Sequence, residues 1–316
     1  MILVTGGAGF IGSNLVKALN DQGHTDIVVV DNLKRSEKHL NLGDCTIADY
    51  FDKQEFFDRL LANRAPTHFS HVFHQGACSD TVESDGHYMM YWNFAFSREL
   101  LDYCQHHMVP MVYASSAATY GASTAFTESP ENERPLNVYG YSKLAFDQHV
   151  RARMSKLRAP VVGLRYFNVY GPREQHKNRM ASLVHHFRRQ LQQGDVVKLF
   201  EGSHGYGPGE QRRDFVYVGD IVKINLFFGE GNHPAGIFNA GSGQSASFND
   251  LANAVIAAEG RGRIEYVPFP EDLKGKYQAF TEADLTKLRD AGYNEAPTPV
   301  MDGVRMTLEE VKRLRG

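Results

Sequence analysis

The chain has 316 residues, of which 42% are hydrophobic and 22% charged, and its formal net charge at pH 7 is -3. This length suits one large α/β domain with a smaller lobe, and a pI of about 6.5 excludes a general basic surface for nucleic acid. The chain has no apolar run of about 18 residues, so we expect no membrane span. Its three cysteines (Cys45, Cys78 and Cys104) are widely spaced, which indicates reduced thiols in a cytoplasmic protein.

The start of the chain predicts a dinucleotide site. A short β-branched run leads into the turn TGGAGFIG at residues 5–12, and a helical pattern follows. In such a unit Gly6 permits the tight turn, Gly9 lets backbone approach a pyrophosphate, and Gly12 lets the helix pack on the strand. Because the strand begins at Met1, we also expect no signal peptide.

The next strand bears on the choice of dinucleotide. It ends in Asp31, 19 residues after Gly12, where a carboxylate would meet the adenosine ribose. The acid alone favours NAD, because it accepts a hydrogen bond from the 2′-hydroxyl and repels a 2′-phosphate. Lys34, Arg35 and Lys38 can reverse that preference by pairing with the phosphate. We expect NADP, with NAD as the alternative.

Two further strands are predicted at residues 45–50 and 71–78. The first ends near the expected adenine, with Lys53 just beyond it, and the second ends in small residues whose backbone could face the cofactor. His71 and His74 invite a metal interpretation, but an odd spacing on a strand directs them to opposite faces. We therefore expect no metal site.

Residues 88–107 have the pattern of a core-packing helix. Asn93 lies inside this helix, where it could instead brace a strand that faces the cofactor. The alternation of strands and helices along this half of the chain predicts a Rossmann-like, doubly wound parallel sheet of the α/β class.

A candidate catalytic group follows the fifth strand. That strand, residues 111–116, ends in Ser116 at the carboxyl edge, outside which ligands of such sheets bind. Tyr139 and Lys143 are four residues apart and share one face of a helix. A neighbouring ammonium favours the phenolate of a group whose ordinary pKa is near 10, so Tyr139 could deprotonate a substrate oxygen held by Ser116. In isolation, the Tyr/Lys spacing would be more typical of an amphipathic surface helix than of a catalytic pair.

The motifs TGGAGFIG, HQGA, SSAATYG and YGYSK, in this order and spacing, resemble the extended short-chain dehydrogenase/reductase family. Further segments are similar to the members that act on an ADP-linked heptose: RYFNVYGPRE at 165–174, HKNRMAS from 176, LFEGS from 199 and KGKYQAFT from 274. The resemblance covers nearly the whole chain. It implies epimerisation at C6 of ADP-D-glycero-D-manno-heptose, in a cytoplasmic homopentamer that supplies heptose for lipopolysaccharide.

The resemblance also implies how the chemistry is divided. Hydride leaves C6 for the nicotinamide, the ketone turns over, and hydride returns to its other face. A base on one side cannot serve both orientations, so a second acid/base is needed. The implied pair is Tyr139 and Lys177, with Lys143 supporting the phenolate and Ser116 binding the substrate. Without the resemblance, Lys177 would be interpreted as a solvated loop lysine.

Binding residues are implied in the same way. Those implied for the cofactor are Gly6, Gly9, Phe10, Ile11, Gly12, Asp31, Asn32, Lys38, Lys53, Gln75, Gly76, Ala77, Cys78, Ser79, Asn93, Lys143, Val169 and Lys177. Those implied for the sugar nucleotide are Asn168, Arg179, His186, Phe200, Glu201, Gly202, Ser203, Arg213 and Tyr277. Arg179 stands where a small residue is expected. Residues 204–211 look like an inserted mobile loop near the diphosphate.

The predicted domains exchange segments along the chain. We expect residues 1–167 with 213–240 to form the NADP-binding domain, and 168–212 with 241–316 to form a smaller α/β substrate-binding lobe.

Two other functions remain as alternatives. A UDP-hexose 4-epimerase of the same family would use Ser116, Tyr139 and Lys143 but would not require Lys177. A non-catalytic cofactor-sensing module would typically lack the Tyr/Lys pair. A 4,6-dehydratase usually carries an Asp-Glu pair where this chain has Ala117 and Ala118, so dehydration is not expected.

Overall fold

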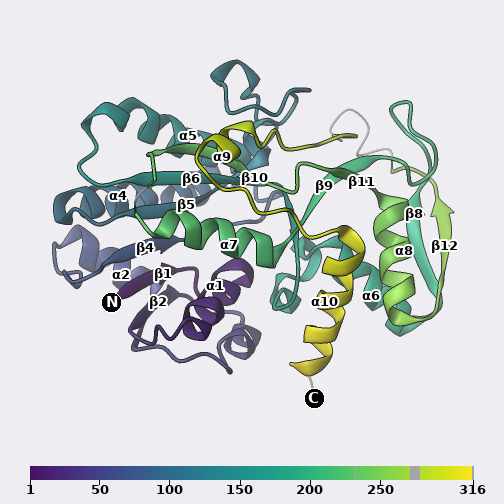
Figure 1. Cartoon of the computed structure of the whole chain (residues 1–316), viewed down its shortest axis with the longest axis horizontal. Helices are drawn as coiled ribbons and strands as arrows, with labels where there is room; N and C mark the ends of the chain where they lie inside the picture. The colour runs from purple at the N-terminus through teal and green to yellow at the C-terminus, as the bar shows by residue number, and fades with distance from the viewer. Residues whose placement is uncertain (232, 271–277, 315–316) are drawn as a thin grey trace.

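A parallel sheet forms the centre of the molecule (Figure 1). The computed structural model describes residues 1–231, 233–270 and 278–314. Within these ranges the sheet has seven strands in the order β10-β6-β5-β4-β1-β2-β3, and every neighbouring pair is parallel. Their bounds are β1 Ile2–Thr5, β2 Ile27–Asp31, β3 Asp49–Asp52, β4 His71–His74, β5 Met111–Ser116, β6 Val161–Tyr166 and β10 Gly236–Ala240. This confirms the Rossmann-like class.

Helices cover both faces of the sheet, so its inner strands are buried on both sides and rich in valine and isoleucine. On β1, Ile2 and Val4 contribute to one hydrophobic cluster and Leu3 to the other, because successive side chains alternate between faces. One cluster is completed by α1 (Phe10–Asp21), α7 (Val218–Gly229) and α9 (Thr286–Asp290). The other is completed by α2 (Lys53–Leu61), α4 (Phe96–His107) and α5 (Val138–Arg153).

A smaller lobe has its own hydrophobic cluster. In the described ranges its strands form a three-stranded sheet in the order β11-β9-β7 and a two-stranded parallel sheet of β12 and β8. These strands are β7 Asn168–Tyr170, β8 Val196–Phe200, β9 Arg212–Tyr217, β11 Ser245–Ser247 and β12 Arg263–Val267. The helices packed with them are α6 Leu183–Gln193, α8 Phe248–Glu259 and α10 Val300–Arg313.

Two segments differ from the sequence predictions. The third strand begins at Asp49 rather than residue 45, because the amide of Thr46 bonds the side chain of Asn20 at the end of α1. The helix predicted at 88–107 is interrupted: α3 (Gly86–Met90) continues through the π-helical turn η2 (Tyr91–Ala95) into α4.

The predicted domain boundaries stay a prediction. α9, which comes from the part assigned to the substrate-binding lobe, packs on β10 of the central sheet. None of the helices in the described part of the chain has both the length and the apolarity needed to cross a bilayer.

Candidate active site

The glycine turn after β1 leaves room only for backbone. Gly6 has φ +68°, and a Cβ there would lie 2.7 Å from the amide nitrogen of Gly76. A Cβ on Gly12 would collide with the carbonyl oxygen of Gly6, so the start of α1 packs directly on the turn. Among the described residues no side chain caps α1 at Gly9. The first N–H groups of the helix therefore suit an anion such as a pyrophosphate.

Asp31 accepts a hydrogen bond from the glycine turn, and its charge is paired with that of Lys38. One carboxylate oxygen accepts the N–H of Ala8 at 2.9 Å. The other accepts the N–H of Asn32 at 2.6 Å and the ammonium of Lys38 at 2.7 Å. Asp31 is only 5% exposed, so its charge is paired with Lys38 inside the site rather than presented to solvent.

The backbone after β4 is held by Asn93 from the π-helical turn. Its Oδ1 accepts the N–H of Cys78 at 2.7 Å, and its Nδ2 donates to the carbonyl of Cys78 and to Ser142 Oγ, each at 3.0 Å. The brace expected from the sequence is therefore present.

The side chain of Gln75 makes hydrogen bonds within the protein, although its position suggested a contact with the cofactor. Its side chain bonds Asn225 on α7 and the hydroxyl of Tyr166, each at 2.9 Å. Only the backbone of Gln75 is left to line the site. Ala77 and Ser79, further along, are exposed.

Lys53 lies against aromatic rings. Its Nζ is 3.5 Å from the centroid of a ring of Trp92, a cation–π distance. Burial lowers the pKa of Lys53 to about 8, and the charges of Lys34 and Lys38 act in the same direction. A bound phosphate would raise that pKa again, which fits a place beside the cofactor.

Ser116, Tyr139 and Lys143 come together at the carboxyl edge of β5. Burial raises the pKa of the Tyr139 phenol, and hydrogen bonding to the Ser116 side chain partly offsets that rise. Lys143 is buried, donates to the carbonyl of Ala114 at 2.8 Å, and has its pKa lowered by burial to about 8. Burial therefore brings the pKa of Lys143 closer to neutral pH, whereas it moves the pKa of Tyr139 further above neutral pH.

A buried ionic network fixes the helix that carries this pair, and the sequence reasoning missed it. Asp147, one turn after Lys143, accepts hydrogen bonds at 2.9 Å from Tyr113, Ser115 and Arg165. The side chains of Arg165 and Asp147 are fully buried. The charged residue Arg165 within the otherwise apolar run at 161–167 was the signal that could have revealed it.

Lys177 lies on a different element from Tyr139, the 3-10 turn η6 (Gln175–Met180). Its Nζ is 5.2 Å from the ring centroid of Phe10 in the glycine turn. Burial lowers the pKa of Lys177, and the buried carboxyl of Glu174 opposes that shift. Lys177 is thus a half-buried lysine beside the cofactor turn and not a solvated loop residue.

The residues expected to bind the sugar differ in their exposure and in their partners. Asn168 is exposed at the start of β7, and Val169 beside it is half-buried. Arg179 extends outward, 67% exposed, and pairs with Asp80 at 2.8 Å. The backbone carbonyl of Arg179 lies 3.3 Å from Nε2 of His186.

The strip expected beside the nucleotide follows β8. Phe200 is 36% exposed and its ring lies 5.6 Å from that of Phe269. Gln211 donates to the carbonyl of Glu201 at 3.1 Å and to Ser203 Oγ at 3.0 Å, which holds the exposed Gly202 between them.

Two further residues were predicted as diphosphate ligands. The guanidinium carbon of Arg213 lies 5.8 Å from the ring centroid of Phe248. Tyr277 lies outside the described residues.

The loop at 204–211 is anchored to this strip. The N–H of Gly209 donates to the carbonyl of Phe200 at 3.0 Å, and Asn249 on α8 donates to the carbonyl of Pro208 at 3.0 Å. The expected mobility of the loop stays a prediction.

His74, one of the two histidines that suggested a metal site, has structural partners. His74 lies between Thr5 Oγ1 at 2.6 Å and Ser97 Oγ at 2.8 Å. Burial lowers its pKa to about 3, so the ring is neutral. No group of three or more His, Cys, Asp or Glu side chains suited to a metal ion occurs in the ranges that the structure covers.

These features define a class. A sequence model of the NAD dependent epimerase/dehydratase family matches residues 2–241, and the chain belongs to this family. It is 58% identical over 311 residues to an ADP-L-glycero-D-manno-heptose-6-epimerase of Alkalilimnicola ehrlichii, which covers 98% of this chain and 97% of that protein.

Solved structures agree with that likeness. The ADP-L-glycero-D-manno-heptose-6-epimerase of Helicobacter pylori superimposes with a TM-score of 0.84 at 31% identity, covering 98% of this chain and 96% of its own. The UDP-glucose 4-epimerase of Thermus thermophilus in complex with NAD gives a TM-score of 0.77 at 28% identity, covering 100% and 99%. A nicotinamide dinucleotide is therefore the cofactor class of this fold and family.

Proposed function

We propose that this chain interconverts ADP-D-glycero-D-manno-heptose and ADP-L-glycero-D-manno-heptose by inversion at C6. The likeness to the Alkalilimnicola protein along nearly the whole chain supports the substrate. One observation carries the mechanism: α5 brings Tyr139 to the carboxyl edge of β5, while η6 brings Lys177 against Phe10 at the glycine turn. Two titratable side chains from separate elements thus border one site, as inversion requires.

The cofactor that suits this site is NADP. The glycine turn has no space for a Cβ at Gly6 or Gly12, which fits backbone contact with a pyrophosphate. The charge of Asp31 is compensated by Lys38, so a 2′-phosphate beside it would meet a paired carboxylate and a cation. Lys53, the backbone of Gln75 to Ser79, Asn93 and Val169 would line the rest of the cofactor.

The bound nicotinamide supplies reversible storage of the C6 hydride during inversion. Around it, Ser116 positions the C6 oxygen and Tyr139 exchanges a proton with that oxygen in one orientation of the sugar. Lys143, charged and buried on the same helix, stabilises the phenolate. Lys177 exchanges the proton in the other orientation, where burial lowers its pKa and so eases the loss of its proton.

The sugar nucleotide would lie against the smaller lobe. Asn168 and His186 are suited to the heptose, and the strip from Phe200 to Ser203 to the ADP. Arg213 offers a permanently charged fork suited to a diphosphate. Arg179, which turns outward to Asp80, would contact the sugar only through its backbone or after that ion pair opens.

The test is inversion of C6 followed by NMR in purified protein. We expect Tyr139→Phe and Lys177→Met each to lower kcat by at least about 100-fold, because positioned proton transfer contributes on that scale. Tyr141→Phe, on an exposed neighbour in α5, and Lys156→Met, on an exposed turn, should leave kcat within about twofold.

Two outcomes would contradict the proposal. Turnover of a UDP-hexose at C4, unaffected by Lys177→Met, would identify a 4-epimerase. Cofactor binding without turnover of either sugar would indicate a sensing module.

By family resemblance we further propose a homopentamer that works in the cytoplasm to supply heptose for lipopolysaccharide. The three unpaired cysteines, two half-buried and one buried, are consistent with a reducing compartment.

A further inference from the structure

Two short turns that are far apart in the sequence meet beside the glycine turn. They are η1 (Ser36–Asn41), which carries Lys38, and η6, which carries Lys177. Asn41, the last residue of η1, has no exposed surface. Its Nδ2 lies 3.0 Å from the carbonyl of Ala8, in the glycine turn, and 3.1 Å from Nδ1 of His176.

His176 links Asn41 to Lys177, the next residue in the chain. The ring is buried, and burial together with the charges of Lys38, Lys177 and Arg35 lowers its pKa to about 4. The ring is therefore neutral at pH 7, and its Nδ1 can share one of the two Asn41 amide hydrogens, whose other acceptors are the carbonyls of Ala8 and Arg173. The backbone carbonyl of His176 accepts a hydrogen bond at 2.7 Å from the guanidinium of Arg35, which lies in the same loop as Lys34 and Lys38.

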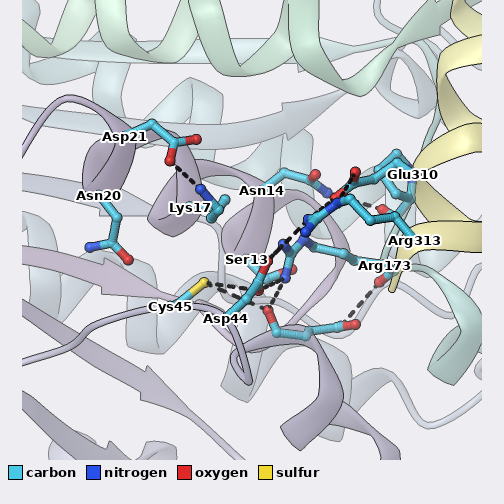
Figure 2. Close-up of polar contacts among 12 residues, drawn as sticks. Ser13, Asn14, Lys17, Asn20, Asp21, Asp44, Cys45, Arg173, Glu310 and Arg313 are labelled. Carbon is cyan, nitrogen blue, oxygen red and sulfur yellow. Dashed lines mark hydrogen bonds and ion pairs between the residues drawn. The ribbon is translucent and has the colours of Figure 1, made fainter. Parts of the chain in front are cut away.

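The entry to η6 is held to the same region. Arg173 has φ +73°, a left-handed conformation that a non-glycine residue adopts only when its surroundings enforce it. Its guanidinium donates to both carboxylate oxygens of Asp44, at 2.8 and 2.7 Å (Figure 2). Its carbonyl accepts from Asn41 Nδ2 at 3.0 Å. Both the side chain and the backbone of Arg173 thus fix where η6 begins.

We propose that His176, held by Asn41, is a positioning residue that sets the place of Lys177 relative to the cofactor turn. This inference rests on the proposed function, in which Lys177 is the second acid/base. The long side chain of Lys177 lies against Phe10 and near Glu174, so its reach toward the sugar depends on where the backbone at His176 is fixed. Through Asn41 and Arg35 that backbone is tied to the same loop that would bind the cofactor phosphate.

The test compares His176→Leu with His176→Asn. Leucine fills the space without an acceptor, whereas asparagine places its carboxamide oxygen near the position of Nδ1. We expect His176→Leu to lower kcat by about 100-fold, the scale of a displacement of roughly 1 Å, with KM and NADP affinity within about threefold. His176→Asn should recover at least a tenth of the wild-type kcat.

Several results would overturn the inference. A folded His176→Leu protein with wild-type kcat would do so, as would a folded His176→Asn protein no faster than the leucine variant. If the leucine variant does not fold, His176→Gln replaces it, because its amide reaches the Nε2 position instead of Nδ1. A glutamine variant as active as the asparagine variant would also count against a role of Nδ1.

A double variant separates this inference from the proposed function. If His176 acts through Lys177, adding His176→Leu to Lys177→Met should lower the residual rate by less than about twofold. A further large loss in the double variant would show an independent structural role. Wild-type inversion in Lys177→Met itself would instead remove the acid/base role of Lys177, and the positioning role would fall with it.

Discussion

Asp31 shows how one carboxylate can serve both the fold and the choice of cofactor. It terminates β2, accepts the N–H of Ala8 in the glycine turn, and pairs with Lys38. A carboxylate engaged in this way has less capacity to accept a ribose 2′-hydroxyl than a solvated one, and its charge no longer repels a phosphate fully. The pair is the basis of the proposed preference for NADP over NAD.

Replacing Lys38 tests this interpretation. In Lys38→Met the charge of Asp31 loses its partner, and a 2′-phosphate loses a cation. We expect NADP affinity to fall by at least about tenfold, or ~1.4 kcal/mol, with NAD affinity within about threefold, both measured by calorimetry. Lys156→Met, on an exposed turn after α5, is the control and should change NADP affinity by less than about threefold. Equal losses for both dinucleotides in Lys38→Met would show that Lys38 does not select between them.

At the scale of elements, ion pairs fasten the second acid/base segment to the rest of the molecule. Asp44, in the segment between η1 and β3, pairs with Arg173 before η6. Arg313 at the end of α10 also reaches Asp44, at 3.4 Å, and pairs with Glu310 (Figure 2). One carboxylate therefore joins the cofactor-side loop, the entry to η6 and the last helix.

The pKa of Asp44 makes this junction sensitive to acid. Hydrogen bonding from Arg173 lowers that pKa from 3.8 to about 2. A carboxyl whose pKa is lower in the folded state adds stability above its unfolded pKa and loses it as the pH falls through the folded pKa.

We expect Asp44→Asn to lower the free energy of unfolding by ~1 kcal/mol at pH 7, a value reduced for solvent screening. The difference from wild type should shrink as the pH falls from about 4 to 2, measured by urea unfolding. Asp290→Asn, on an exposed carboxylate at the end of α9, should show no such difference. A constant difference across that pH range would mean that the ion pair is not its source.

At the scale of the molecule, the proposed site lies where the carboxyl edge of the central sheet meets the smaller lobe. β7 leaves β6 for the three-stranded sheet, and α7 returns from β9 to pack on α1 (Figure 1). The chain thus passes between the two sheets several times. We propose that the glycine turn, the Tyr139 helix and the Lys177 turn border one site, although they are far apart in the sequence.

Much of this arrangement could be predicted from local sequence patterns, but contacts between distant residues could not. The buried strands, the glycine turn and the Tyr139/Lys143 pair follow from periodicity and from backbone conformations that only glycine tolerates. The Asn41–His176 and Asp44–Arg173 contacts join residues 135 and 129 positions apart, so they depend on how the lobes pack. The π-helical turn at Asn93 was hidden because its apolar pattern continues that of the flanking helices.

The central claim, inversion through hydride storage at C6, is tested most directly by isotope tracing. ADP-D-glycero-D-manno-heptose carrying deuterium at C6 is incubated with the holoenzyme in ordinary water, and the product is analysed by NMR and mass spectrometry. We expect inverted C6 that keeps its deuterium, since Tyr139 and Lys177 move only the oxygen-bound proton. Inversion with loss of the label to water would contradict hydride storage and indicate proton abstraction from carbon.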